Sequence, residues 1–313
     1  MSSQQHPVLR HWSGLSAEHQ SAVLLVTGIS ILGLSDNFVP FVSAQIGLGQ
    51  FHFMRSAIAL VCVVGLAMMT GLTLRPVNWP AVLIRTVLLA ASMSLYFSVL
   101  SFLPVAIAGA GLFTSPIFVL LFSIILFGLR PGWRRVLAVL TGSAGVWLVL
   151  RPESLGFHPL QLLPVLAGAF YALSSIVTKR FCAGESPLAL VAVYFAVLGV
   201  VGLLWAVLAP ALIAGPVPPE ADFIVKGLVF ADAAVWFWLT VMAVLTVLSI
   251  WMLTRAYQIA ETSYAVIYEY SYLISAGLIG VWLWQAQFSA SSLGGMGLIV
   301  VSGLIITFAT RQR

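Results

Sequence analysis

The sequence predicts an all-α integral membrane protein, and its composition and its apolar runs predict it. Hydrophobic residues make up 61% of the 313 residues and charged residues only 7%, whereas a soluble domain carries roughly 25% charged residues. Mean hydropathy is +1.08. Apolar runs long enough to cross about 30 Å of hydrocarbon as helices recur along the chain. Because the runs are apolar on every face, we expect helices and not a barrel.

Ten of these runs are expected to span the membrane, separated by short clusters of Gly, Pro and Arg. The expected spans are 21–44, 52–71, 81–102, 105–127, 134–150, 160–178, 187–209, 233–256, 262–285 and 293–310. Residues 1–20 contain no apolar core of signal-peptide length. We therefore expect them to form a cytoplasmic tail, with residues 311–313 as a second one.

The distribution of Lys and Arg predicts the orientation. Of the 14 basic residues, only Arg151 and Lys226 fall in loops opposite the N-terminus. Because cytoplasmic loops accumulate Lys and Arg, both termini are expected in the cytoplasm. This thin spread explains the net charge of +5 without a nucleic-acid partner. Arg85, one turn inside the third predicted span, is expected to extend toward the lipid headgroups.

A weak internal repeat relates the two halves of the chain. Aligning residues 101–122 with 256–277 pairs Ala110 with Ala265, Tyr96 with Trp251, Phe113 with Tyr268 and Thr114 with Glu269. A repeat of five spans is odd, so its second copy must enter the membrane from the opposite side. Inverted repeats with a site near the midplane are a recurring plan of secondary transporters. We therefore expect two five-helix repeats, 21–150 and 151–310.

The segment 260–284 places the carboxylate of Glu269 within a predicted span that is otherwise mostly apolar and aromatic. An acidic residue near mid-bilayer costs at least about 2.5 kcal/mol, so it usually faces a cavity or a partner. Three roles stay open: a ligand for a cationic substrate, a proton-coupling site, and half of a structural ion pair.

Tyrosines accompany this carboxylate. Tyr264, Tyr268 and Tyr272 recur on one helical stripe, flanked by Glu269 and Tyr270. Aromatic faces around a carboxylate suit an ammonium group. The alternative is that these tyrosines anchor the helix at the interface or pack between helices.

A second acidic residue, Asp36, lies in the outer half of the first predicted span. Arg55, near the start of the second span, is expected at a similar depth. Two interpretations remain: a structural ion pair between them, or participation of either residue in binding a substrate carboxylate or in gating.

Four segments together resemble a known family, over nearly the whole chain. They are LSDNFVP (34–40), QFHFMRSAIAL (50–60), FLPVAIAGAGLFTSPIFVLLFS (102–123) and AYQIAETSYAVIYEYSYL (256–273). The chain resembles the EamA-like branch of the drug/metabolite transporter superfamily. Pro40 departs from the pattern, because many relatives have Lys there. The resemblance implies ten helices in two halves around a central cavity that opens to each side in turn, moving small metabolites.

The expected function is therefore a secondary transporter in the bacterial inner membrane. It would move an amino-acid-like zwitterion or amine, more as an exporter than as an importer. A channel, a receptor-like protein and an uptake or exchange carrier for a quaternary-ammonium metabolite remain alternatives. The sequence lacks a nucleophile elbow, a metalloprotease motif and a P-loop, so we expect neither an enzyme nor a cofactor or metal.

The expected partners are the lipid bilayer and the small-molecule substrate, and the protein is expected as a monomer or a homodimer. Gly and Ala in 142–146, 275–280 and 294–297 are expected to permit close helix contacts within the chain. The candidate substrate-binding residues are Glu269, Tyr268, Tyr270, Tyr96, Trp251, Thr114, Asp36 and Arg55.

Overall fold

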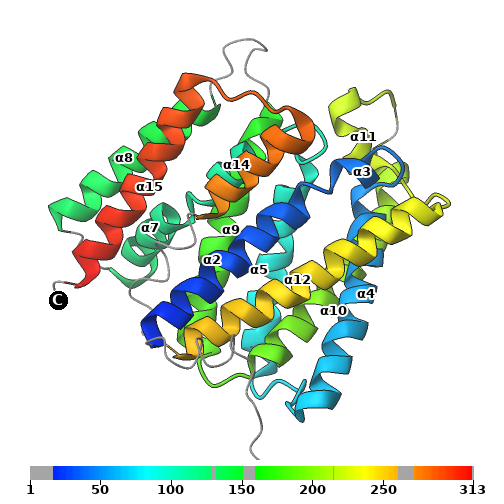
Figure 1. The fold of residues 1–313 in the computed structure, drawn as a ribbon, viewed down its shortest axis with the longest axis horizontal. Helices are drawn as coiled ribbons and strands as arrows, with labels where there is room; N and C mark the ends of the chain where they lie inside the picture. The colour runs from blue at the N-terminus through cyan, green and yellow to red at the C-terminus, as the bar shows by residue number, and fades with distance from the viewer. Residues whose placement is uncertain (1–16, 129–131, 151–158, 214, 260–270, 312–313) are drawn as a thin grey trace, which may run out of the picture.

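The computed structural model describes residues 17–128, 132–150, 159–213, 215–259 and 271–311, and within these ranges every regular element is a helix. The elements are α2 (Ala17–Asp36), α3 (Pro40–Ser43), α4 (Leu48–Thr70), α5 (Trp79–Ser98), α6 (Val105–Leu112), α7 (Ser115–Phe127), α8 (Trp133–Leu150), the 3₁₀ helix η1 (Pro159–Leu162), α9 (Leu163–Phe181), α10 (Pro187–Leu212), α11 (Pro219–Val225), α12 (Ala233–Ile259), α14 (Ser271–Trp284) and α15 (Ala290–Arg311). The long helices lie side by side in one tilted bundle (Figure 1).

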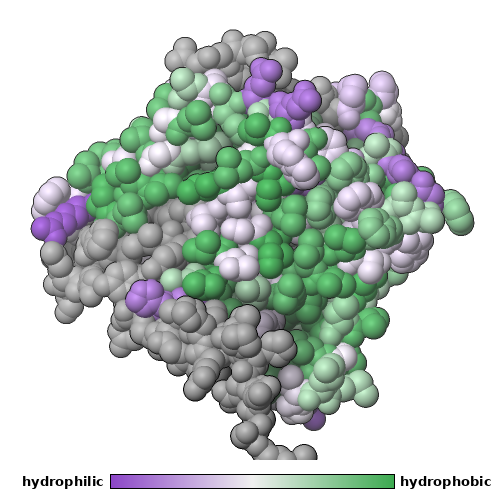
Figure 2. Space-filling view, in the orientation of Figure 1, coloured by the Kyte–Doolittle hydropathy of each residue, from purple (hydrophilic) through white to green (hydrophobic). Residues whose placement is uncertain are grey.

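Seven helices in the described ranges are long and apolar enough to cross a membrane. They are His19–Ser43, Leu48–Thr70, Trp79–Ser98, Val105–Phe127, Pro159–Phe181, Pro187–Leu212 and Ala233–Leu253, with shorter apolar helices at Val136–Val149, Ser271–Trp284 and Ala290–Ser302. Each of these stretches overlaps one predicted span. Apolar residues cover most of the coloured surface in Figure 2, and the strongly hydrophilic ones lie mainly toward its edges. The chain is a multi-pass membrane protein.

The first predicted span, 21–44, corresponds to the apolar stretch His19–Ser43, which a turn after Asp36 divides into α2 and α3. A turn over 37–39 separates α2 from α3. In it, Phe38 N–H donates to the Ser35 carbonyl at 3.0 Å, and Val39 N–H donates to the Asp36 carbonyl at 3.2 Å. The reason is Pro40, which has no N–H to continue the helical ladder. The carboxylate of Asp36 therefore sits at a helix end within the bundle.

The fourth predicted span is also divided. The segment 105–127 forms α6 and α7, which meet at Phe113 and Thr114. Thr114 N–H donates to the Gly111 carbonyl at 3.2 Å, and Pro116 has no N–H for the carbonyl four residues earlier. A second helix break thus lies in the first half of the chain.

Helix pairing follows a regular scheme. Helix α2 packs along α12 and α5 packs along α9, while α4 pairs with α10 and α8 with α15. Figure 1 shows α8 and α15 together at one edge of the bundle. Glycines make two of these contacts close. A Cβ on Gly49 of α4 would lie 2.5 Å from the backbone nitrogen of Ala206 in α10, and one on Gly145 of α8 would lie 2.7 Å from the carbonyl oxygen of Gly295 in α15. The predicted close contacts within the chain are confirmed for 142–146 and 294–297.

Arg85 of α5 does not extend toward headgroups as expected. Its Nε donates to Thr178 Oγ1 of α9 at 3.2 Å, and Nη1 donates to the carbonyl of Leu190 in α10 at 3.3 Å. The Arg85 carbonyl in turn accepts a hydrogen bond from Ser174 Oγ at 3.0 Å. The donors of the guanidinium find acceptors on neighbouring helices, so this residue joins α5 to α9 and α10.

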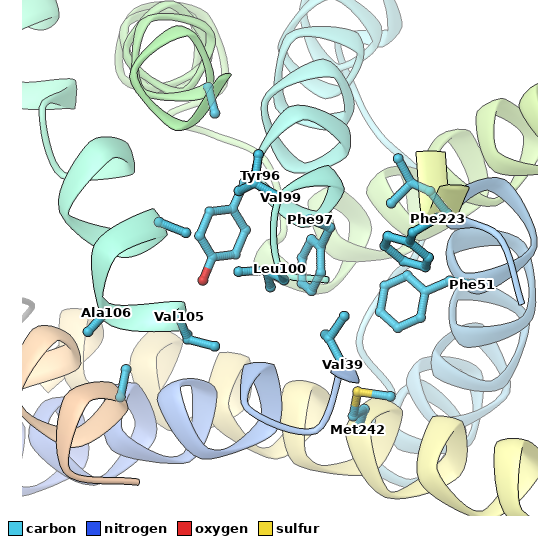
Figure 3. Close-up of a cluster of buried hydrophobic side chains, with 14 of the residues drawn as sticks. Val39, Phe51, Tyr96, Phe97, Val99, Leu100, Val105, Ala106, Phe223 and Met242 are labelled. Atoms are coloured by element: carbon cyan, nitrogen blue, oxygen red, sulfur yellow. The ribbon is translucent and has the colours of Figure 1, made fainter. Parts of the chain in front are cut away.

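The core that positions the candidate site lies where α5 meets the turn after α2 (Figure 3). Tyr96 and Phe97 are consecutive on α5 and both are buried. The Tyr96 hydroxyl points away from Phe97, which lies near Phe51 of α4 in Figure 3. The ring centroids of Phe51 and Phe97 are 5.3 Å apart. Consecutive residues of α5 therefore face two different neighbourhoods of the bundle.

Candidate functional site

The carboxylate of Asp36 is the centre of a polar cluster buried between three helices. Only 7% of its surface is exposed. Its Oδ2 accepts a hydrogen bond of 2.6 Å from the hydroxyl of Tyr272 in α14 and one of 3.0 Å from the hydroxyl of Tyr96 in α5. The two tyrosine hydroxyls also contact each other. A carboxylate far from water thus keeps two hydrogen-bond donors, which is what its burial requires.

Gly109 of helix α6 provides the space for the ring of Tyr272. A Cβ on Gly109 would lie 2.7 Å from Tyr272 Cε1, so only glycine permits this approach. The ring of Phe113, at the break between α6 and α7, has its centroid 5.6 Å from that of Tyr272. Both helix breaks therefore border the Asp36 cluster.

Arg55 of α4 is buried to 3% exposure, but it does not form the expected ion pair with Asp36. Over the described ranges, the one ion pair closer than 4.0 Å is elsewhere: Lys226 Nζ lies 2.8 Å from Asp222 Oδ2. The guanidinium instead lies over aromatic faces, with Cζ 4.4 Å from the Phe97 centroid and 5.0 Å from the Phe51 centroid. Asp36 is occupied by the tyrosines, and the two charges interact only through space. The structural ion pair is thus wrong as a direct contact.

An aromatic plug of Phe38, Phe41, Trp238 and Trp284 lies beside the cluster, next to the break after Asp36. The rings of Phe41 and Trp238 stack at 4.4 Å with an interplanar angle of 14°, and Trp284 lies 4.8 Å from Phe41. Trp284 Nε1 also donates to the Asn37 carbonyl at 2.9 Å. Two rings of the plug come from the turn and α3, one from α12 and one from α14, so the plug joins three parts of the bundle.

The remaining predicted site residues are placed unevenly. The buried Thr114 donates its hydroxyl to the Gly111 carbonyl at 2.7 Å, within the helix break. Trp251 on α12 is 46% exposed. Glu269, Tyr268 and Tyr270 lie outside the described residues.

Of the predicted residues, the structure brings Asp36 and Tyr96 together, and it adds Tyr272. The stripe of tyrosines with helical spacing contained the signal for Tyr272, but its partner Asp36 is remote in sequence. Within the described ranges, no three His, Cys, Asp or Glu side chains come together in an arrangement that could hold a metal ion.

Comparison with known proteins identifies a family match in the first half of the chain. The model of the EamA-like transporter family matches residues 20–151, the stretch that carries Asp36, Arg55, Tyr96 and Thr114. Residues 20–151 thus form a domain of the EamA-like transporter family. The matched stretch contains both helix breaks and ends at the close of α8.

Curated relatives of this EamA-like chain are named as transporters. The riboflavin transporter of Vibrio cholerae is 26% identical, covering 92% of this chain and 93% of its own. The pseudopaline exporter of Pseudomonas aeruginosa is 24% identical, covering 92% and 96%. The S-adenosylmethionine uptake transporter of Rickettsia bellii is 22% identical, covering 74% and 73%. The names indicate transporters of small molecules and not enzymes.

The fold of this EamA-like protein also matches a solved crystal structure. The superposition has a TM-score of 0.63 at 19% sequence identity and covers 93% of this chain and 98% of the other. At that identity the likeness concerns the fold alone.

Proposed function

We propose that this EamA-like protein is a secondary transporter that moves an amino-acid-like zwitterion or amine across the bacterial inner membrane by alternating access. One observation carries the proposal. The buried carboxylate of Asp36 sits at a helix break and is held by tyrosines from two other helices. Such a group can exchange its tyrosine donors for the ammonium of a substrate.

The cost of placing Asp36 inside the bundle supports this role. Ionisable residues within membrane helices are expensive, and they generally mark substrate, ion or proton pathways. Breaks in helices at membrane depth are tolerated only where the freed backbone is buried in protein or lines a cavity. In transporters, such discontinuous helices commonly form the binding site. The breaks after Asp36 and at Phe113 both border Tyr272.

The helix pairing supports two inverted five-helix repeats, 21–150 and 151–310. If the halves are exchanged, the first span (α2) corresponds to the sixth (α9), and the third (α5) corresponds to the eighth (α12). The contact of α2 with α12 then becomes that of α9 with α5, and both contacts are extensive. The pairs α4 with α10 and α8 with α15 correspond to themselves. Rocking of such halves about the central site is the motion that alternating access uses.

The relatives support a small organic substrate without choosing it, since their names concern riboflavin, S-adenosylmethionine and pseudopaline. A carboxylate beside aromatic rings favours a positively charged group. Glu269, Tyr268, Tyr270 and Trp251 remain candidates for further contacts. We further propose that the protein works as an exporter, with both termini in the cytoplasm, and that it is a monomer or a homodimer. Oriented membrane vesicles would measure the direction of transport.

Counterflow in proteoliposomes tests the proposal. Vesicles loaded with an unlabelled mixture of L-amino acids should accumulate the labelled mixture transiently and saturably, a behaviour that a carrier shows and an open channel does not. Choline is measured in parallel as a cation without a carboxylate. We expect Asp36→Asn to lower the initial rate by at least about tenfold, because the charge-assisted contact is lost.

The matched control is Asp222→Asn, which removes an exposed carboxylate with one ion-pair partner. It should leave the rate unchanged. Equal rates for Asp36→Asn and the wild type would contradict the role of Asp36. No saturable counterflow with either probe would contradict the transport proposal itself.

A further inference from the structure

Among the residues that the structure describes, three neighbouring polar side chains on α4 carry atoms without a hydrogen-bond partner. They are Nδ1 and Nε2 of His52, Nε of Arg55 and Oγ of Ser56. All three residues are more than nine-tenths buried. Positions 52, 55 and 56 are three and four residues apart, so the side chains share one face of the helix. We refer to them as the α4 donor cluster.

The α4 donor cluster is enclosed by α5 and α10. The ring of Phe97 from α5 meets His52 edge-on at 5.4 Å, and its face carries the Arg55 guanidinium at 4.4 Å. On the α10 side, glycines allow the helices to approach. A Cβ on Gly202 would lie 2.8 Å from His52 Cβ, and one on Gly199 would lie 3.2 Å from Ser56 Cβ.

Leaving these atoms unpartnered is unfavourable. A buried polar group without a hydrogen bond costs about 1–3 kcal/mol, and native proteins satisfy nearly all such groups. Arg55 can only donate, and Ser56 and one His52 nitrogen can also donate. In the described parts of the chain, no carboxylate lies within 4.0 Å of the Arg55 guanidinium. The missing complement is an acceptor, and a negative one would also compensate the charge of Arg55.

We propose that the α4 donor cluster binds the carboxylate of the transported substrate, so that the substrate is a zwitterion with its two charges on separate subsites. This inference rests on the proposed transport function. Tyr96 donates to Asp36, and the next residue, Phe97, contacts Arg55 and His52. Consecutive positions of α5 therefore connect the negative subsite with the positive one. A substrate with only a positive charge leaves the α4 donor cluster unsatisfied and binds more weakly.

The environment of Arg55 reports carboxylate binding directly. Full-length protein labelled with ¹⁵Nε-arginine is purified in detergent, and the Nε–H signal of Arg55 is assigned by its loss in Arg55→Lys. If that variant does not fold, Phe97→Leu provides the assignment, because it removes the ring current of the aromatic face under the guanidinium. Acetate, L-alanine, L-alaninamide and sodium chloride are the probes.

The proposal predicts saturable shifts of the Arg55 signal with acetate and L-alanine, and no such shift with L-alaninamide or chloride. Ser56→Ala, which keeps every charge, should weaken acetate binding about fivefold through the loss of one hydrogen bond. The matched control is Thr86→Ala, since Thr86 Oγ1 is also buried and unpartnered but lies three turns from Phe97 on α5. It should leave acetate binding unchanged.

An Arg55 signal that ignores acetate and L-alanine, or that chloride shifts as strongly, would overturn the inference. Arg55 would then be a structural cation held by aromatic rings. Transport with a silent Arg55 signal would remove the anion subsite and leave the proposed function standing. A responsive Arg55 signal without counterflow would keep the anion subsite and remove the proposed transport function.

Discussion

The hydroxyl of Tyr272 donates a 2.6 Å hydrogen bond to the carboxylate of Asp36, although 236 positions separate the two residues. Tyr96 donates to the same oxygen at 3.0 Å. Three helices from both halves of the chain thus meet at one carboxylate. Any motion that separates α14 from α2 must break this contact, so we expect the ligand of Asp36 to be coupled to the arrangement of the helices.

Removing one tyrosine hydroxyl at a time tests this coupling. Tyr272→Phe should raise apparent substrate affinity by up to about tenfold, because the substrate ammonium no longer has to displace a hydrogen bond to a charged group, which contributes about 1.5–3 kcal/mol. Tyr96→Phe should have a smaller effect, since its contact with Asp36 is longer. Half-saturation in the counterflow assay measures both. Unchanged affinity in both variants would show that the hydroxyls only pack.

The glycines of α4 differ sharply in what surrounds them. A Cβ on Gly49 would lie 2.5 Å from the Ala206 backbone nitrogen, whereas one on Gly65 would meet nothing within 4 Å. Gly49→Ala should therefore destabilise the protein by at least about 1–3 kcal/mol through overpacking. Gly65→Ala, on the same helix, should be neutral or stabilise by about 0.5–1 kcal/mol. Thermal unfolding in detergent compares the two, and equal melting temperatures would refute the close α4–α10 contact.

The aromatic plug should limit access to the buried turn after Asp36. Val39 in that turn is fully buried, so a Val39→Cys reporter in a chain without Cys62 and Cys182 should react slowly with a polar thiol reagent. Adding Trp238→Ala removes the ring that stacks on Phe41 and should accelerate labelling severalfold. Trp236→Ala, an exposed tryptophan of the same helix, should not. Identical rates in all three proteins would show that the plug is not a barrier.

The Cys182 thiol should react slowly while the protein is folded. Burial raises the pKa of the Cys182 thiol, and the nearby Arg85 opposes this shift only in part. Less thiolate is then present at neutral pH, so alkylation of folded protein should be at least about tenfold slower than after denaturation and should accelerate as pH rises. Single-cysteine variants and mass spectrometry measure the rates. Rapid labelling of folded Cys182 at neutral pH would contradict its burial.

The sequence by itself determined the membrane class, the approximate helix positions and the family resemblance, because these depend on local composition and on motifs. It also singled out Asp36, Arg55 and Tyr96, since ionisable or aromatic residues in apolar runs are conspicuous wherever the chain places them. The predicted spans overlap the apolar helices that the structure describes.

Only the tertiary structure decided which side chains contact each other. Asp36 accepts hydrogen bonds from tyrosines and forms no ion pair with Arg55, and Arg85 donates to neighbouring helices. Turns next to Pro40 and Pro116 divide two of the apolar stretches beside the Asp36 cluster. Hydropathy averages over a helix and is insensitive to which face meets which neighbour. The position of Tyr272 beside Asp36 depends on how α14 crosses α2 and on the space that Gly109 leaves. Contacts between helices far apart in the chain are set by packing, and no local pattern encodes them.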